Sequence, residues 1–170
     1  MKKILFVIAL WCALPAHASL NVGDTLREDM GKDQHGHPVR MGELHNRVVV
    51  MTHWASWCGP CRAELPILEN LQKVAGRPRL AVIAVNFHED PDIYQRLRRA
   101  LIPSPISFVY DHGGVWAKQD GVDRLPNMFL INKSGRVAFH HVGYRESELD
   151  GFVDEINQLL LEPGPTDPAQ

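Results

Sequence analysis

Two cysteines separated by two residues lie where an apolar run gives way to a helical pattern. They are Cys58 and Cys61. The preceding run, residues 48–51, is rich in β-branched side chains and predicts a buried strand. Residues 63–74 carry apolar side chains at helical spacing and predict an α-helix. The pair therefore marks the junction between a strand and a helix.

A helix that begins at the pair would activate its first cysteine. The first turn of a helix has free N–H groups and the positive end of the macrodipole, and both stabilise a thiolate. A Cys-x-x-Cys pair in such a place can lower a thiol pKa from about 8.5 to between about 3.5 and 7.5. We therefore expect Cys58 to attack disulfides. Cys61, one turn later and more buried, is expected to resolve the mixed disulfide.

A metal site is the main structural alternative for a Cys-x-x-Cys pair. Half of a zinc site would need a second pair of ligands. The sequence has no second cysteine pair, and the candidates on paper are His35 with His37 and His140 with His141. Tryptophan and proline around the cysteines favour redox chemistry, so we expect no metal and no other cofactor. A transient metal contact at His35 and His37 stays open.

The N-terminus has the three parts of a secretory signal. Lys2 and Lys3 make a basic end, residues 4–14 are an apolar run, and a small-x-small pattern ends at Ala18. We therefore expect cleavage after Ala18 and export to the periplasm. A retained anchor is the alternative, but the apolar run is shorter than the roughly 20 residues that span a bilayer. Acylation of Cys12 is disfavoured because the bulky Trp11 precedes it.

Length and charge bound the remaining possibilities. A chain of 170 residues with 45% hydrophobic content predicts one domain, here residues 19–162, followed by a flexible proline-rich tail at 163–170. Without Lys2 and Lys3, the 18 basic residues fall to 16 against 20 acidic ones, a net charge of −4. No basic run favours binding to nucleic acid or to an anionic membrane surface. We expect neither, and no stable membrane insertion after cleavage.

The stretch from Trp54 to Cys61, with Gly59 and Pro60 between the cysteines, resembles the active site of the thioredoxin superfamily. The resemblance covers residues 23–160. It implies a thioredoxin-like three-layer α/β fold, in which helices flank a central mixed sheet. The rim residue Trp57, together with Gly59 and Pro60, would then contact the client protein.

Three further features resemble the exported TlpA, ResA and DsbE group. Residues 33–36 look like the turn of an N-terminal hairpin, and residues 90–120 look like an inserted block of helix and strand. Glu64 completes a Cys-x-x-Cys-x-x-Glu pattern. The remaining patterns predict strands at 80–85, 127–131 and 136–140, an extended segment at 106–110, and helices at 92–101 and 147–160.

A proline before the strand at 127–131 resembles the cis-proline loop of thioredoxin folds. This is Pro126, and the resemblance implies that the backbone of Leu125 pairs with an incoming peptide as an added strand. Gly143 resembles the glycine that lets a partner approach the same groove, or it is a simple turn after a strand. Leu125 departs from the small or β-branched residue usual there, which puts the substrate preference in doubt.

A buried acid near Cys61 would help the resolving thiol to lose its proton. Plain thioredoxin has an aspartate two residues before the first tryptophan of its motif, where this chain has Thr52. Glu64 lies one helical turn after Cys61 and is the candidate, since burial would raise its pKa toward neutrality. The alternative is a surface glutamate favoured by the helix dipole. His53 is given no role.

The sequence thus predicts an exported thiol:disulfide oxidoreductase. Gly-Pro between the cysteines is the pairing of thioredoxin, whose potential is about −270 mV, and this favours a reductant. The resemblance implies recharging by a membrane thiol-electron donor, with apocytochrome c in cytochrome c biogenesis, or misoxidised proteins, as clients. A disulfide isomerase or oxidase is one alternative. A copper-handling chaperone is another, although a proline loop shaped for peptides fits a soft-metal site poorly.

Overall fold

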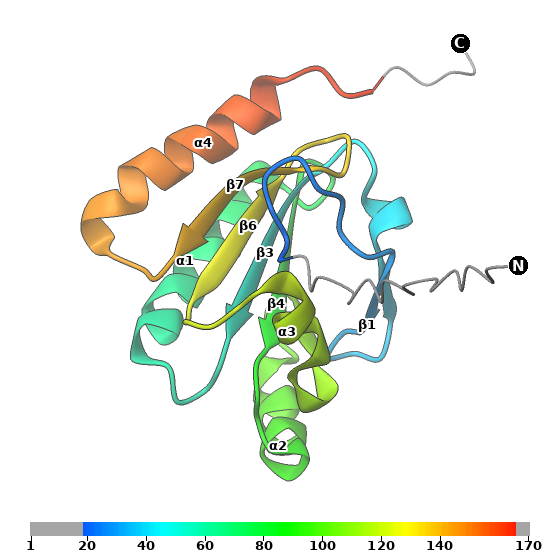
Figure 1. Cartoon of the computed structure of the whole chain (residues 1–170), viewed down its shortest axis with the longest axis vertical. Coiled ribbons are helices and arrows are strands. Elements are labelled where there is room, and N and C mark those ends of the chain that lie inside the picture. Colours follow the sequence, from blue (N-terminus) through cyan, green and yellow to red (C-terminus); the bar gives the residue numbers. More distant parts are fainter. Residues whose placement is uncertain (1–18, 166–170) are drawn as a thin grey trace, which may run out of the picture.

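Five strands form the central sheet of the computed structural model, which describes residues 19–165 (Figure 1). The expected signal at 1–18 and most of the expected tail lie outside these residues. The strand order is β5-β4-β3-β6-β7. The strands are β3 (Val48–Trp54), β4 (Leu80–Asn86), β5 (Ser107–Tyr110), β6 (Asn127–Ile131) and β7 (Val137–Val142).

The sheet is mixed, as expected. β3 pairs in parallel with β4, and β4 with β5, whereas β6 and β7 join antiparallel beyond β3. Every residue of β3 and β4 is buried. Central strands covered on both faces need apolar side chains on both sides, which explains the unbroken hydrophobic runs in the sequence.

Two helices cover one face of the sheet, where the cysteines also lie. They are α1 (Gly59–Ala75) and α4 (Leu149–Leu161), the latter preceded by the short helix η3 (Glu146–Glu148). Their apolar sides meet Val48, Val50 and Phe108 in one core cluster. Near the end of α4, Leu159 is fully buried, and Leu160 is half-buried against the same cluster.

An N-terminal hairpin and the short helix α3 (Val115–Asp120) cover the opposite face (Figure 1). The hairpin consists of β1 (Asp29–Lys32) and β2 (Pro38–Arg40), followed by the short helix η1 (Met41–Leu44). Gly31 has a φ of +77°, and a Cβ atom there would lie 2.9 Å from the indole ring of Trp116. Glycine therefore lets β1 pass directly over this ring.

The expected inserted block contains α2 (Pro91–Leu101), β5, the short helix η2 (His112–Gly114) and α3. The hairpin is fastened to this block through Gln34, which is buried. The Gln34 amide nitrogen donates to the carbonyl oxygen of Ile106 over 2.9 Å, and its amide oxygen accepts the Phe108 N–H, also over 2.9 Å. The block thus supplies β5, the strand at one edge of the sheet, and holds the hairpin in place.

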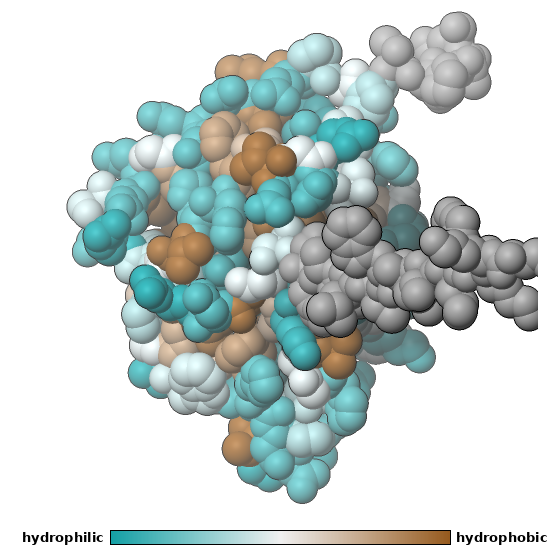
Figure 2. All heavy atoms as spheres, viewed as in Figure 1, coloured by the Kyte–Doolittle hydropathy of each residue, from teal (hydrophilic) through white to brown (hydrophobic). Residues whose placement is uncertain are grey.

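The surface is mostly hydrophilic on the face drawn in Figure 2, where hydrophobic residues form separate patches. Within residues 19–165, no helix has both the length and the apolar character needed to cross a bilayer.

Candidate active site

The cysteine pair forms a disulfide at the N-terminus of α1, with the two sulfur atoms 2.02 Å apart. Cys58 is the N-cap residue, and its Sγ accepts the Cys61 backbone N–H over 3.2 Å. Cys58 is 6% exposed, whereas Cys61 has no exposed surface. The helix begins at Gly59, at the cysteine pair as expected and ahead of the apolar pattern at 63–74. A proline in the first turn is already set to helical φ and has no N–H to leave unsatisfied.

The loop before the helix separates one buried and one exposed tryptophan. Trp54 is buried and packs edge-on against Phe108, with the ring centroids 5.3 Å apart. Trp57 is 61% exposed, and Gly59 and Pro60 are also exposed. The three predicted contact residues therefore form an accessible rim around a sparingly exposed Cys58.

The Leu125–Pro126 peptide bond is cis and directly precedes β6. The register pairs Asn127 with His53, so this loop lies at the end of β3 that leads to the cysteines. The Gly143 N–H donates to the Pro126 carbonyl oxygen over 2.7 Å, and Gly143 has a φ of +85°. Gly143 is thus a turn after β7, and it also joins the proline loop, so both predicted roles remain compatible with its position.

Glu64 is the buried acid on the cysteine face of the sheet. Its side chain is only 3% exposed, and its Oε2 accepts a hydrogen bond from the Thr52 hydroxyl over 2.8 Å. Burial raises the pKa of Glu64 to about 7, and the Thr52 hydrogen bond opposes part of that rise. The alternative interpretation, a glutamate on the surface, is therefore wrong, because α1 turns Glu64 toward β3.

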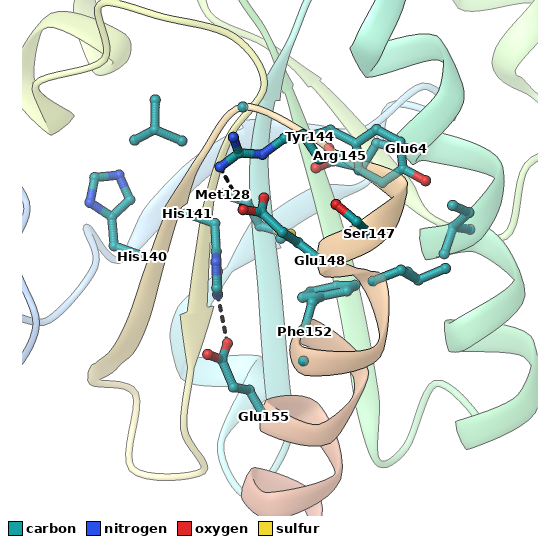
Figure 3. A pocket seen from close by; sticks show the side chains of 15 residues that line it. Glu64, Met128, His140, His141, Tyr144, Arg145, Ser147, Glu148, Phe152 and Glu155 are labelled. Atoms are coloured by element: carbon teal, nitrogen blue, oxygen red, sulfur yellow. Dashed lines mark hydrogen bonds and ion pairs between the residues drawn. The ribbon is translucent and has the colours of Figure 1, made fainter.

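A groove of about 450 Å³ runs between β7 and α4 and reaches Glu64 (Figure 3). Met128, Gly143 and Phe152 also line it. Two ion pairs lie along it: His141 Nε2 with Glu155 Oε2, and Arg145 with Glu148, each over 2.6 Å. The groove gives Glu64 a route to solvent beside the proline loop.

A second buried polar group, which the sequence did not predict, lies on the opposite face of the sheet. His53 has no exposed surface, and its Nε2 lies 3.0 Å from Asp120 Oδ2. Asp120 also pairs with the guanidinium of Arg27. A histidine inside an apolar strand signals that a partner exists, but sequence spacing could not identify one 67 residues away.

The histidine pairs considered for a metal have other contacts. His35 and His37 stack with their ring centroids 5.9 Å apart. His140 stacks on Phe129 and lies 2.9 Å from the Asn127 side-chain oxygen. Within residues 19–165, no three His, Cys, Asp or Glu side chains are grouped so that they could hold a metal ion.

Comparisons with known proteins agree with this geometry. The Redoxin family model matches residues 21–160. The thiol-disulfide oxidoreductase ResA of Halalkalibacterium halodurans is 29% identical over 130 residues, which cover 76% of this chain and 71% of the relative. A structure assigned as the thiol:disulfide interchange protein DsbE of Chlorobium tepidum is 29% identical with a TM-score of 0.74, covering 84% of this chain and 99% of that one.

The exposed lipoprotein thioredoxin Etrx1 of Streptococcus pneumoniae shares the fold at 24% identity and a TM-score of 0.66, over 75% of this chain and 96% of that one. The expected thioredoxin-like fold is thereby confirmed, with its central mixed sheet, flanking helices and N-terminal hairpin, and the structure shows that the sheet has five strands.

Proposed function

The chain belongs to the Redoxin family and is a thiol-disulfide oxidoreductase with a Cys-x-x-Cys active site, and we propose that it reduces disulfides of exported proteins. The observation that carries this proposal is the position of Cys58, which is the N-cap of α1 and lies between an exposed rim and the buried Cys61. Electrostatics at that position favour a thiolate on the first cysteine.

The reduced protein would act in two steps. The Cys58 thiolate attacks a client disulfide, which forms a mixed disulfide and releases the first client thiolate. Cys61 then gives up its proton and attacks the Cys58 sulfur. This releases the second client thiolate and forms the Cys58–Cys61 disulfide, so two electrons pass to the client.

Glu64 is proposed as the base for the second step. Its pKa of about 7 leaves it partly ionised near neutral pH, where it can accept a proton from a thiol one helical turn away. Thr52 holds the carboxylate through its hydroxyl. The groove beside Glu64 would let that proton leave to solvent.

The client is proposed to bind across the rim and the proline loop. Trp57, Gly59 and Pro60 would contact it on one side of the disulfide, while Leu125, Pro126 and Gly143 would contact it on the other. The backbone of Leu125 would pair with an extended client segment. Apocytochrome c and misoxidised envelope proteins, in the periplasm, are the proposed clients, and a membrane thiol-electron donor would restore the dithiol.

Trapping tests the proposal directly. Cys61→Ser cannot resolve the mixed disulfide, so we expect it to capture clients on Cys58, visible as bands on non-reducing gels that disappear with reductant. Cys58→Ser is the matched control and is expected to trap few or none. Equal trapping by both variants would overturn the assignment of nucleophile and resolver.

An insulin-reduction assay tests the direction and the metal alternative. The dithiol form of the wild type is expected to reduce insulin without added metal and to retain no copper after desalting. Copper retention together with absent turnover would instead support the chaperone alternative. Net oxidation of a reduced protein would instead support the oxidase alternative, and rearrangement of the disulfides of a scrambled protein would support the isomerase alternative.

A further inference from the structure

A buried carboxylate outside the exchange chemistry holds the loop that presents Cys58. Glu89 follows β4 and is only 7% exposed. Its Oε2 accepts the Ser56 backbone N–H over 3.0 Å, and its Oε1 accepts the Ser56 hydroxyl over 2.6 Å. The Asn86 side-chain amide donates a third hydrogen bond to Oε2 over 3.0 Å. Both oxygens are therefore engaged, and two of the three bonds reach Ser56.

Ser56 is the middle of the segment that connects β3 to the cysteines. The Cys58 N–H donates to the Ala55 carbonyl oxygen over 3.1 Å, so the turn 55–58 is closed by its own backbone. Trp57 stands between these two held points and is largely exposed. Fixing Ser56 therefore fixes the direction in which Trp57 and Cys58 face an incoming protein.

Glu89 is itself anchored by the inserted block. The Tyr110 hydroxyl donates to the Glu89 carbonyl oxygen over 2.9 Å, and the Tyr110 ring stacks on Tyr94 of α2 at 4.5 Å. The next residue, Asp90, caps α2 by accepting the Asp92 N–H over 2.9 Å. The carboxylate thus extends from a rigid support made by α2 and β5.

We propose that Glu89 is a positioning residue for disulfide exchange, and that the inserted block serves as a brace for the active-site loop through it. The inference rests on the proposed function for its substrate, a protein disulfide. Glu89 touches no reacting atom in this arrangement. It acts by keeping the loop in the conformation that a client binds. If only a fraction of the molecules held that conformation, the apparent affinity for the client would fall by the same fraction.

Steady-state kinetics with insulin provide the first test. Glu89→Ala removes all three hydrogen bonds and is expected to raise KM by about tenfold, with kcat within about twofold. A small aromatic disulfide needs little docking, so its turnover should change by less than about twofold. Glu43→Gln, at an exposed acid of η1, is the matched control and should match the wild type in both assays.

Glu89→Gln separates hydrogen bonding from charge. The glutamine oxygen can still accept the Ser56 N–H, and its NH₂ group can donate to the Ser56 hydroxyl oxygen, so KM should return to within about threefold of the wild type. A glutamine variant as impaired as the alanine variant would overturn positioning by hydrogen bonds. Should Glu89→Ala fold poorly, Ser56→Ala removes only the hydroxyl contact and is expected to raise KM by about threefold.

Amide hydrogen exchange gives a readout that needs no client. The Ser56 N–H should exchange at least about tenfold faster in Glu89→Ala, while amides of β3 and β4 keep their protection. Uniform loss of protection, or a lowered melting temperature with unchanged KM and unchanged Ser56 exchange, would reduce Glu89 to a purely structural residue. A wild type that reduces no protein disulfide would sink the proposed function, while this exchange measurement would still decide the role of Glu89.

Discussion

Glu64 and Asp120 are both buried carboxyl groups, but they lie on opposite faces of the same sheet and have different partners. Glu64 receives one hydrogen bond, from the neutral Thr52 hydroxyl. Asp120 receives an arginine and a histidine, Arg27 and His53. Burial without a cation raises the pKa of Glu64 to about 7. A buried acid can thus be left ready to take up a proton, or it can be tied into an ion pair that fastens segments together.

The difference follows from what each face has to do. The base that we propose on the cysteine face must change its protonation state during the reaction, so a weak, neutral partner suits it. The opposite face joins the N-terminal segment, β3 and α3, which are distant in sequence, and there an ion pair between them suits it. Four predictions test this contrast.

The largest expected effect is on stability, at Asp120. Asp120→Asn leaves Arg27 without its anion in a poorly hydrated site, and we expect the free energy of unfolding to fall by about 3 kcal/mol. Urea unfolding at pH 7 measures this change. Glu64→Gln is the matched amide substitution on the other face and should not lower stability at that pH. Equal losses in the two variants would erase the contrast between the faces.

The pH dependence of stability should reveal Glu64 next. Its pKa is about 7 when folded and 4.5 ordinarily, so between these values the folded state holds a proton that the unfolded state releases. This contribution to stability is complete below pH 4.5 and is lost as pH rises through 7, by up to about 3 kcal/mol. Between pH 4.5 and 8, the free energy of unfolding of the wild type should therefore fall relative to that of Glu64→Gln. Parallel curves would contradict it.

Exchange kinetics should place the same residue in the second chemical step. Glu64→Gln removes the proposed general base, and we expect resolution of a preformed mixed disulfide to slow by about 100-fold at neutral pH. Alkylation of Cys58 should change by less than about threefold. Glu69→Gln, further along α1, serves as the control. A slowed first step with an unaffected second step would assign Glu64 a different role.

The smallest effect is expected at Thr52. Thr52→Val removes the hydroxyl that lowers the pKa of Glu64, so the pH midpoint of the resolution step should move upward by less than about one unit. Thr52→Ser retains the hydroxyl and should restore the original midpoint. A downward shift in the valine variant would show that the hydroxyl does not stabilise the ionised carboxylate.

Local patterns in the sequence predicted the parts of this molecule that lie close together along the chain. The strand, the cysteine pair and Glu64 fall within a short stretch, so helical spacing placed the acid near Cys61. The apolar pattern of α1 starts only at residue 63, since Gly59 and Pro60 also occur in turns, but the expected helix start at the cysteine pair agrees with the structure.

Contacts between distant segments could not be predicted in this way. Asp120 lies 67 residues from His53 and 93 from Arg27, and Glu89 lies 33 residues from Ser56. No periodicity links such positions, because the sheet order brings them together. Adjacent leucines are equally apolar, so the sequence does not show that Leu159 is more deeply buried than Leu160.

The Gln34 amide bonds to β5 and to Ile106 just before it, at an edge of the sheet that another strand could pair with. By donating to one carbonyl and accepting from one N–H, a single side chain imitates the backbone of a neighbouring strand. Unpaired sheet borders recruit other extended chains and lead to aggregation. In the proposed function, an extended client segment would then pair at the proline loop, beside the disulfide, and not along β5.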